Sequence, residues 1–131
     1  LSELQKLYAI LHWSALPGTS RHHWSSDFDI FDPDRLPDEK QLQLSCAEYA
    51  DGGYFQELNH WLTENMAAFG FYRPYHSFLG GVAVEPWHIS YYPVAGKALE
   101  QLQLDIIYDL LSHKNILDIY FKYILKIFIF H

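Results

Sequence analysis

The chain has 131 residues, 50% of them apolar, so one domain can bury a hydrophobic core without disulfides or other cross-links. Its formal net charge of -7 argues against a nucleic-acid partner, because binding to a phosphate backbone needs a basic surface. The single cysteine cannot form an internal disulfide or a cysteine-based zinc site, so a metal would have to be held by histidine and carboxylate side chains.

The first predicted elements are a helix and a strand joined by a histidine-rich segment. Residues 2–13 place leucines at helical spacing, and Pro17 and Gly18 end this helix. Residues 27–30 alternate aspartates with apolar side chains, which predicts a half-buried strand whose two aspartates lie on an open, acidic face. Residues 32–45 contain two prolines and predict an irregular loop.

The second half of the chain alternates between helical and strand patterns. Glycines at 52 and 53 precede a helix whose apolar side chains fall on one side, and Gly70 ends it. Residues 72–93 carry aromatic and β-branched runs on both sides of two glycines, which predicts a hairpin or paired strands. Residues 95–115 predict a helix with Leu99 on its apolar face, and residues 115–130 predict another. This order indicates an α+β fold, a small antiparallel sheet packed against several helices.

The most apolar stretch, residues 123–131, is far shorter than the roughly 20 residues that span a bilayer, and it contains a lysine. We therefore expect a packed terminal element and no transmembrane segment. The chain begins with Leu1 and lacks the charged, apolar and small-residue pattern of a secretory signal.

Two short stretches carry residues with metal chemistry. The first, "TSRHHWSSDFDIFDP", offers His22 or His23 together with Asp29, and the second, "VEPWHISYY", offers Glu85 and His88. A catalytic zinc site needs three protein ligands and an open position for water, and two imidazoles with one carboxylate are an accepted set. A further carboxylate outside the ligand set can take a proton from the water. The two stretches together therefore supply the parts of a hydrolytic zinc site on the sheet.

The two stretches also resemble known motifs. "SRHHWSSDFDI" is similar to the SxHxxGxAxD motif, and "EPWHISY" to the ExxH motif, of the zinc D-alanyl-D-alanine carboxypeptidases and dipeptidases of the VanY-like peptidase family M15. The resemblance covers most of residues 10–97. It implies one zinc ion, with the following roles: His22, Asp29 and His88 as ligands, Glu85 as general base, Ser20 and Trp87 at the substrate, and His23 as a supporting neighbour outside the ligand set.

The resemblance implies a zinc carboxypeptidase that hydrolyses a small peptide of the peptidoglycan type, in the bacterial cell envelope or periplasm, or alternatively in the cytoplasm. Two departures stand out. Ser25 takes the place of the motif glycine, in a turn that can require positive φ. The family's upstream segment with a substrate-binding arginine has no counterpart, so we expect residues 1–131 to form a single peptidase-like domain that lacks this N-terminal segment.

The same residues are compatible with two other classes of protein. The chain could be a zinc-retaining, non-catalytic peptide- or glycan-binding domain, which the missing arginine segment would permit. It could also be a structural domain without metal, in which these side chains are satisfied polar residues on strand edges. His60 and Glu64, four residues apart on a predicted helix, are interpreted as an exposed polar pair rather than as a second metal site.

Overall fold

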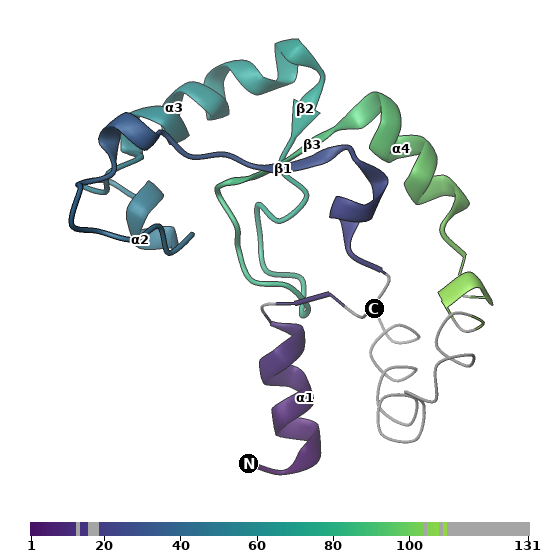
Figure 1. Cartoon of the computed structure of the whole chain (residues 1–131). Coiled ribbons are helices and arrows are strands. Elements are labelled where there is room, and N and C mark those ends of the chain that lie inside the picture. Colours follow the sequence, from purple (N-terminus) through teal and green to yellow (C-terminus); the bar gives the residue numbers. More distant parts are fainter. Residues whose placement is uncertain (13, 16–18, 104, 108, 110–131) are drawn as a thin grey trace.

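The computed structural model describes residues 1–12, 14–15, 19–103, 105–107 and 109. Three short strands lie between helix α3 on one side and helix α4 on the other (Figure 1). The predicted α+β class with a small antiparallel sheet is therefore confirmed. The described elements are, in chain order, α1 (Glu3–Leu11), the 3-10 helix η1 (Arg21–Trp24), β1 (Asp27–Asp29), η2 (Pro33–Arg35), α2 (Cys46–Tyr49), α3 (Gln56–Asn65), η3 (Met66–Phe69), β2 (Phe71–Tyr72), β3 (His88–Tyr91) and α4 (Tyr92–Gln101).

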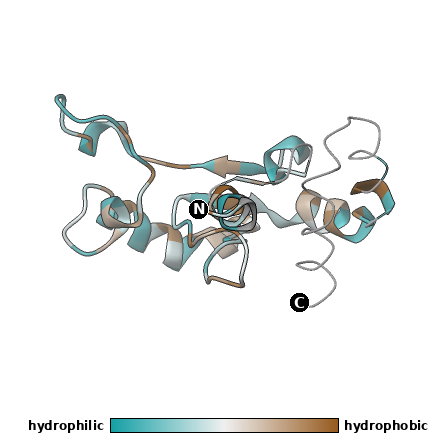
Figure 2. Ribbon diagram, turned by 90° about the horizontal axis from the view of Figure 1, so that it is seen from below, coloured by the Kyte–Doolittle hydropathy of each residue, from teal (hydrophilic) through white to brown (hydrophobic). Residues whose placement is uncertain are grey.

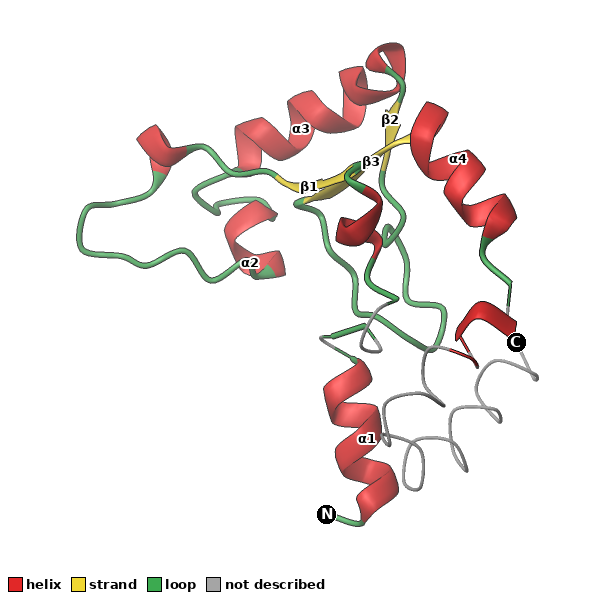
Figure 3. Ribbon diagram, turned by 45° about the vertical axis from the view of Figure 1, so that its right-hand side comes forward, coloured by secondary structure: helices red, strands yellow, loops and turns green. Residues whose placement is uncertain are grey.

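The sheet has the order β1-β3-β2, and both pairings are antiparallel (Figure 3). The prediction of paired strands is confirmed, because β2 pairs with β3. The connection between them is long, however, and the two glycines at 80 and 81 lie within it rather than in a tight hairpin turn. The central strand is thus the last of the three in the chain.

The prediction that both aspartates of β1 lie on an open face holds for Asp29, which is exposed, but is wrong for Asp27. Asp27 is buried, whereas Phe28 is 46% exposed. The alternating pattern separates two faces of a strand but does not say which face is covered. Burial of Asp27 is possible because partners from other segments satisfy its carboxylate, as described below.

The two best-patterned helices form where the sequence predicts them. The side chain of Ser2 accepts a hydrogen bond from the backbone N–H of Gln5, and the Gln5 side chain accepts one from the backbone N–H of Ser2, so a capping box begins α1. Helix α3 continues into η3 and stops at Gly70, whose φ of 80° is readily available only to glycine. The short helix α2 was not predicted.

Helix α4 departs from the prediction at its start and on its buried face. It begins at Tyr92, directly after β3, with Pro93 in the first turn, where proline is tolerated. Ala95 is its buried residue, whereas Leu99, predicted to lie on the packed face, is 53% exposed. The helix predicted over residues 115–130 lies outside the described residues.

The core is an aromatic cluster of Tyr49, Phe55 and Trp87, all almost fully buried. The Tyr49 and Phe55 rings lie 5.0 Å apart between centroids, and the Tyr49 and Trp87 rings 5.6 Å. Because Trp87 directly precedes β3, the core fixes the start of the central strand. Leu36, Leu42, Leu44 and Leu58 pack around the cluster.

The helices carry both hydrophilic and hydrophobic residues (Figure 2), as is usual for helices that expose one face to water. In the part of the chain that the structure describes, none of the helices has the length and apolar character that a membrane span requires.

Candidate metal centre

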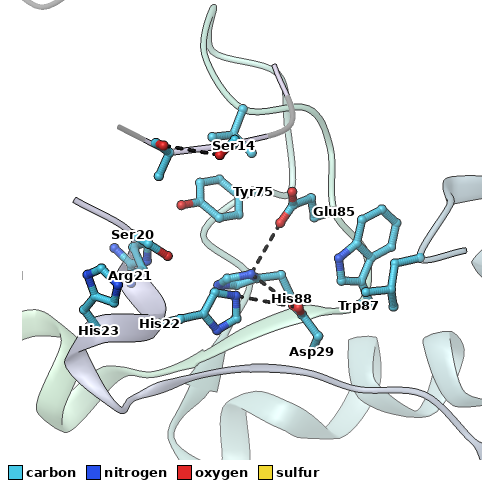
Figure 4. Close-up of a pocket in the computed structure, with 13 residues that line it drawn as sticks. Ser14, Ser20, Arg21, His22, His23, Asp29, Tyr75, Glu85, Trp87 and His88 are labelled. Atoms are coloured by element: carbon cyan, nitrogen blue, oxygen red, sulfur yellow. Dashed lines mark hydrogen bonds and ion pairs between the residues drawn. The ribbon is translucent and has the colours of Figure 1, made fainter. Parts of the chain in front are cut away.

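A cavity of about 590 Å³ opens beside the start of β3 (Figure 4). It is lined by side chains from the first residues of η1, from the end of β1 and from the segment leading into β3. All of the candidate site residues named from the sequence line this cavity: Ser20, His22, His23, Asp29, Glu85, Trp87 and His88.

The strand register brings His22, Asp29 and His88 together. Asp29 and His88 are direct partners in the β1–β3 pairing, so their side chains share a face. His22 reaches the same place because η1 ends at Ser25 in the left-handed conformation (φ 56°), which turns the chain into β1. One ligand-type atom from each of the three residues lies within 4.8 Å of the others.

His22 points one ring nitrogen into the site and the other at the backbone. Its Nε2 lies 3.6 Å from Asp29 Oδ2. Its Nδ1 lies 3.2 Å from the carbonyl oxygen of Asp27. A carbonyl oxygen only accepts hydrogen bonds, so Nδ1 is the donor and the neutral ring keeps its lone pair on Nε2. That lone pair faces Asp29 and the neighbouring ring of His88, whose centroid is 4.7 Å away.

His88 is the buried member of the group, with 3% of its side chain exposed. Its Nδ1 lies 3.2 Å from Asp29 Oδ1 and 3.3 Å from Glu85 Oε2. Its Nε2 lies 2.9 Å from Asp27 Oδ1. Burial acts to lower the pKa of His88, but the three carboxylates around its ring outweigh burial and raise the pKa to about 9.

Asp27 is a site-associated residue that the sequence did not single out. Ser26 and Ser90 donate to its Oδ2 at 2.6 and 2.9 Å. Arg21 and His88 donate to its Oδ1, each at 2.9 Å. Burial acts to raise the pKa of Asp27, but these four hydrogen bonds outweigh burial and hold its pKa below the usual range. The sequence signal that could have found it is the second aspartate on the same strand face as Asp29.

Arg21, the first residue of η1, is the positively charged member of this hydrogen-bond network. Besides Asp27, its guanidinium donates to the hydroxyls of Tyr72 (2.6 Å) and Ser90 (2.9 Å). It also lies 4.6 Å from the centre of the Trp24 ring. The charge of Arg21 is therefore matched by Asp27 within the protein.

Glu85 lies in the segment before β3, with its carboxylate beside the His88 ring (Figure 4). Its backbone N–H donates to the Tyr75 carbonyl at 3.0 Å, which fixes this segment against the wall of the cavity. The Tyr75 ring also packs edge-on against His88 at 4.9 Å, and burial raises the pKa of the Tyr75 hydroxyl to about 12. A carboxylate thus stands next to the three converging side chains without being one of them.

The remaining sequence candidates have more varied surroundings. Ser20 is the N-cap of η1 and lines the cavity; its backbone carbonyl accepts from the His23 N–H, whereas its side chain makes no capping hydrogen bond. His23 lines the cavity but is not one of the three residues whose ligand atoms converge. Trp87 borders the cavity with one edge while it packs mainly in the core. His60 and Glu64 are both exposed, as interpreted from the sequence, and His60 Nε2 lies 3.5 Å from Asp51.

The chain is similar in sequence to known proteins. A family model described as VanY, D-alanyl-D-alanine carboxypeptidase, matches residues 2–94. A protein of Haemophilus influenzae described as uncharacterized is 44% identical over 104 residues, which are 78% of this chain and 79% of that protein. A D-alanyl-D-alanine carboxypeptidase of Enterococcus faecalis is 36% identical over 84 residues, 60% of this chain and 25% of the enterococcal protein.

No solved structure matches the chain significantly. The family model, however, covers most of the chain and includes the whole of the cavity lining. The chain therefore belongs to the VanY family of D-alanyl-D-alanine carboxypeptidases.

Proposed function

We propose that the chain is a zinc metallopeptidase of the D-alanyl-D-alanine carboxypeptidase type, which hydrolyses a peptide bond in bacterial cell-wall peptides. The observation that carries this proposal is the convergence of His22, Asp29 and His88 within 4.8 Å, in a cavity that also holds the Glu85 carboxylate. The family supports the substrate class. On the same basis we propose that the protein acts in the bacterial cell envelope.

The three side chains suit zinc in type and in spacing. Two imidazoles and one carboxylate are a common zinc ligand set that leaves a fourth position for water. Ligands of tetrahedral zinc stand about 3.4 Å apart, given bonds of about 2.0–2.1 Å. The Asp29 oxygens lie 3.6 Å from His22 Nε2 and 3.2 Å from His88 Nδ1. We propose these three residues as the ligands of one zinc ion.

Bound zinc would polarise the scissile carbonyl and lower the pKa of a water molecule to about 7. The protein's own contribution is made by Glu85. Its carboxylate borders the His88 ring at 3.3 Å without belonging to the ligand group, so it can accept the proton of the attacking water. Glu85 would then pass this proton to the leaving amino group.

The substrate would be a short peptide, since pockets of a few hundred cubic ångströms hold ligands of that size. Ser20, whose hydroxyl has no capping bond to η1, is the proposed polar contact for the peptide backbone. Trp87 would contact the substrate only along the edge that borders the cavity.

The test combines metal analysis with hydrolysis of a peptide ending in D-Ala-D-Ala. Wild-type protein should hold one zinc ion and release D-alanine, and a chelator should abolish both. His22→Ala should lose the metal, whereas the adjacent His23→Ala should keep it. Glu85→Gln should keep the metal and lose turnover by at least about a hundredfold, as expected for a general base.

Three results would count against the proposal. Wild-type protein without zinc, even after reconstitution, would remove the metal centre. Equal loss of zinc in the His22 and His23 variants would show that the ligand set is wrong. Bound zinc without hydrolysis of any wall peptide would instead favour a non-catalytic peptide- or glycan-binding domain.

A further inference from the structure

Both histidines of the candidate centre are held through one residue, Asp27. Its backbone carbonyl faces His22 Nδ1 at 3.2 Å, and its carboxylate faces His88 Nε2 at 2.9 Å. Both acceptors lie on the side of each ring away from the site. The opposite nitrogens, His22 Nε2 and His88 Nδ1, are the ones that face Asp29.

We propose that Asp27 is the positioning residue of this centre, setting the tautomer and orientation of both imidazoles so that one unprotonated nitrogen of each can bind the metal. The inference rests on the proposed function, because it takes His22 and His88 as metal ligands. Metal-bound histidines generally donate their other N–H to a carboxylate or a carbonyl, which fixes the ring and makes the ligand nitrogen more basic. Asp27 supplies one acceptor of each kind.

The carboxylate is itself held rigidly. Ser26 and Ser90 occupy its Oδ2, and Arg21 shares Oδ1 with His88. Arg21 is in turn tied to the Tyr72 hydroxyl on β2 at 2.6 Å. Asp27 thus has partners from η1, from β3 and from the residue before β1, and this network favours the one orientation of the His88 ring that points Nε2 at the carboxylate.

The first test reads the tautomers in the wild-type protein and needs no variant. Long-range ¹H–¹⁵N NMR of the zinc-loaded, histidine-labelled protein should find the proton of His22 on Nδ1 and that of His88 on Nε2. A proton on the opposite nitrogen of either ring would overturn the inference.

The second test measures zinc affinity by competition with a chelator. Asp27→Asn should weaken zinc binding by about 10- to 100-fold, the usual cost of losing a partner of a metal-bound histidine. Asp51→Asn is the matched control, because it makes the same substitution at an exposed carboxylate beside another histidine, His60, which does not line the cavity. The control should bind zinc like the wild type.

The outcomes separate this inference from the proposed function. Unchanged affinity in Asp27→Asn, or an equal loss in Asp51→Asn, would overturn the positioning role while peptide hydrolysis could persist. Zinc binding that depends on Asp27, without hydrolysis, would leave the inference standing and remove the peptidase. Absence of zinc from the wild type would overturn both. If Asp27→Asn does not fold, the NMR tautomers decide.

Discussion

Replacing Gly53 with alanine should destabilise the whole domain. A Cβ at this position would collide with the backbone carbonyls of Ala47 and Glu48, at the turn between α2 and α3. These atoms belong to the main chain and cannot swing aside, so helix α2 or the start of α3 would have to move. Gly53 also donates to the Ala50 carbonyl at 2.9 Å within this turn, which leaves little room for adjustment.

The size of the effect follows from overpacking. An added group in a tight site costs about 1–3 kcal/mol, and contacts with main-chain atoms should place this variant near the upper end, at about 3 kcal/mol. For a domain of this length, each kcal/mol lowers Tm by roughly 3–5 °C, so Tm should fall by about 10 °C. Differential scanning calorimetry or thermal circular dichroism measures this directly.

Gly81→Ala is the matched control. A Cβ there would meet nothing within 4 Å, so the same substitution should be neutral or should stabilise the protein by up to about 1 kcal/mol. Any stabilisation would come from the lower conformational entropy of alanine in the unfolded chain. A Tm of Gly53→Ala within about 2 °C of this control would refute the close approach between α2 and α3.

Two further substitutions test local features. Ser25→Gly should raise the free energy of unfolding by about 0.5–1 kcal/mol, because it relieves the left-handed φ of 56°; a Tm that does not rise would contradict this. Tyr49→Phe should cost about 1–2 kcal/mol in urea unfolding, because it removes the 2.7 Å hydrogen bond to the Ile30 carbonyl while the ring stays packed. An unchanged unfolding midpoint would mean that this hydrogen bond contributes nothing.

Local patterns in the sequence predict two of the helices and the motif residues of the candidate site. Helices α1 and α3 form near their predicted bounds, because caps and apolar spacing are local signals. The motif residues, although far apart in the chain, line one cavity. Their roles as ligands and base remain predictions.

The wrong predictions concern which side chains are buried, because burial depends on partners that are distant in the sequence. Period-two alternation in β1 could not reveal that Asp27 faces inward, because Arg21, Ser90 and His88 satisfy it from three other positions. The same carboxylate lies 2.9 Å from His88 Nε2, a contact between residues 61 positions apart in the sequence. In α4, Ala95 is buried and the larger Leu99 is exposed, and the apolar spacing of the helix alone does not say which face is covered.

The sheet order has a consequence for how the centre comes into being during synthesis. Strand β3, which pairs with both of the other strands, is the last of the three to leave the ribosome. His22 and Asp29 are therefore synthesised before His88, and a nascent chain that stops before residue 88 holds only two of the three converging side chains. A metal that binds all three side chains would therefore stabilise the completed sheet relative to any earlier intermediate.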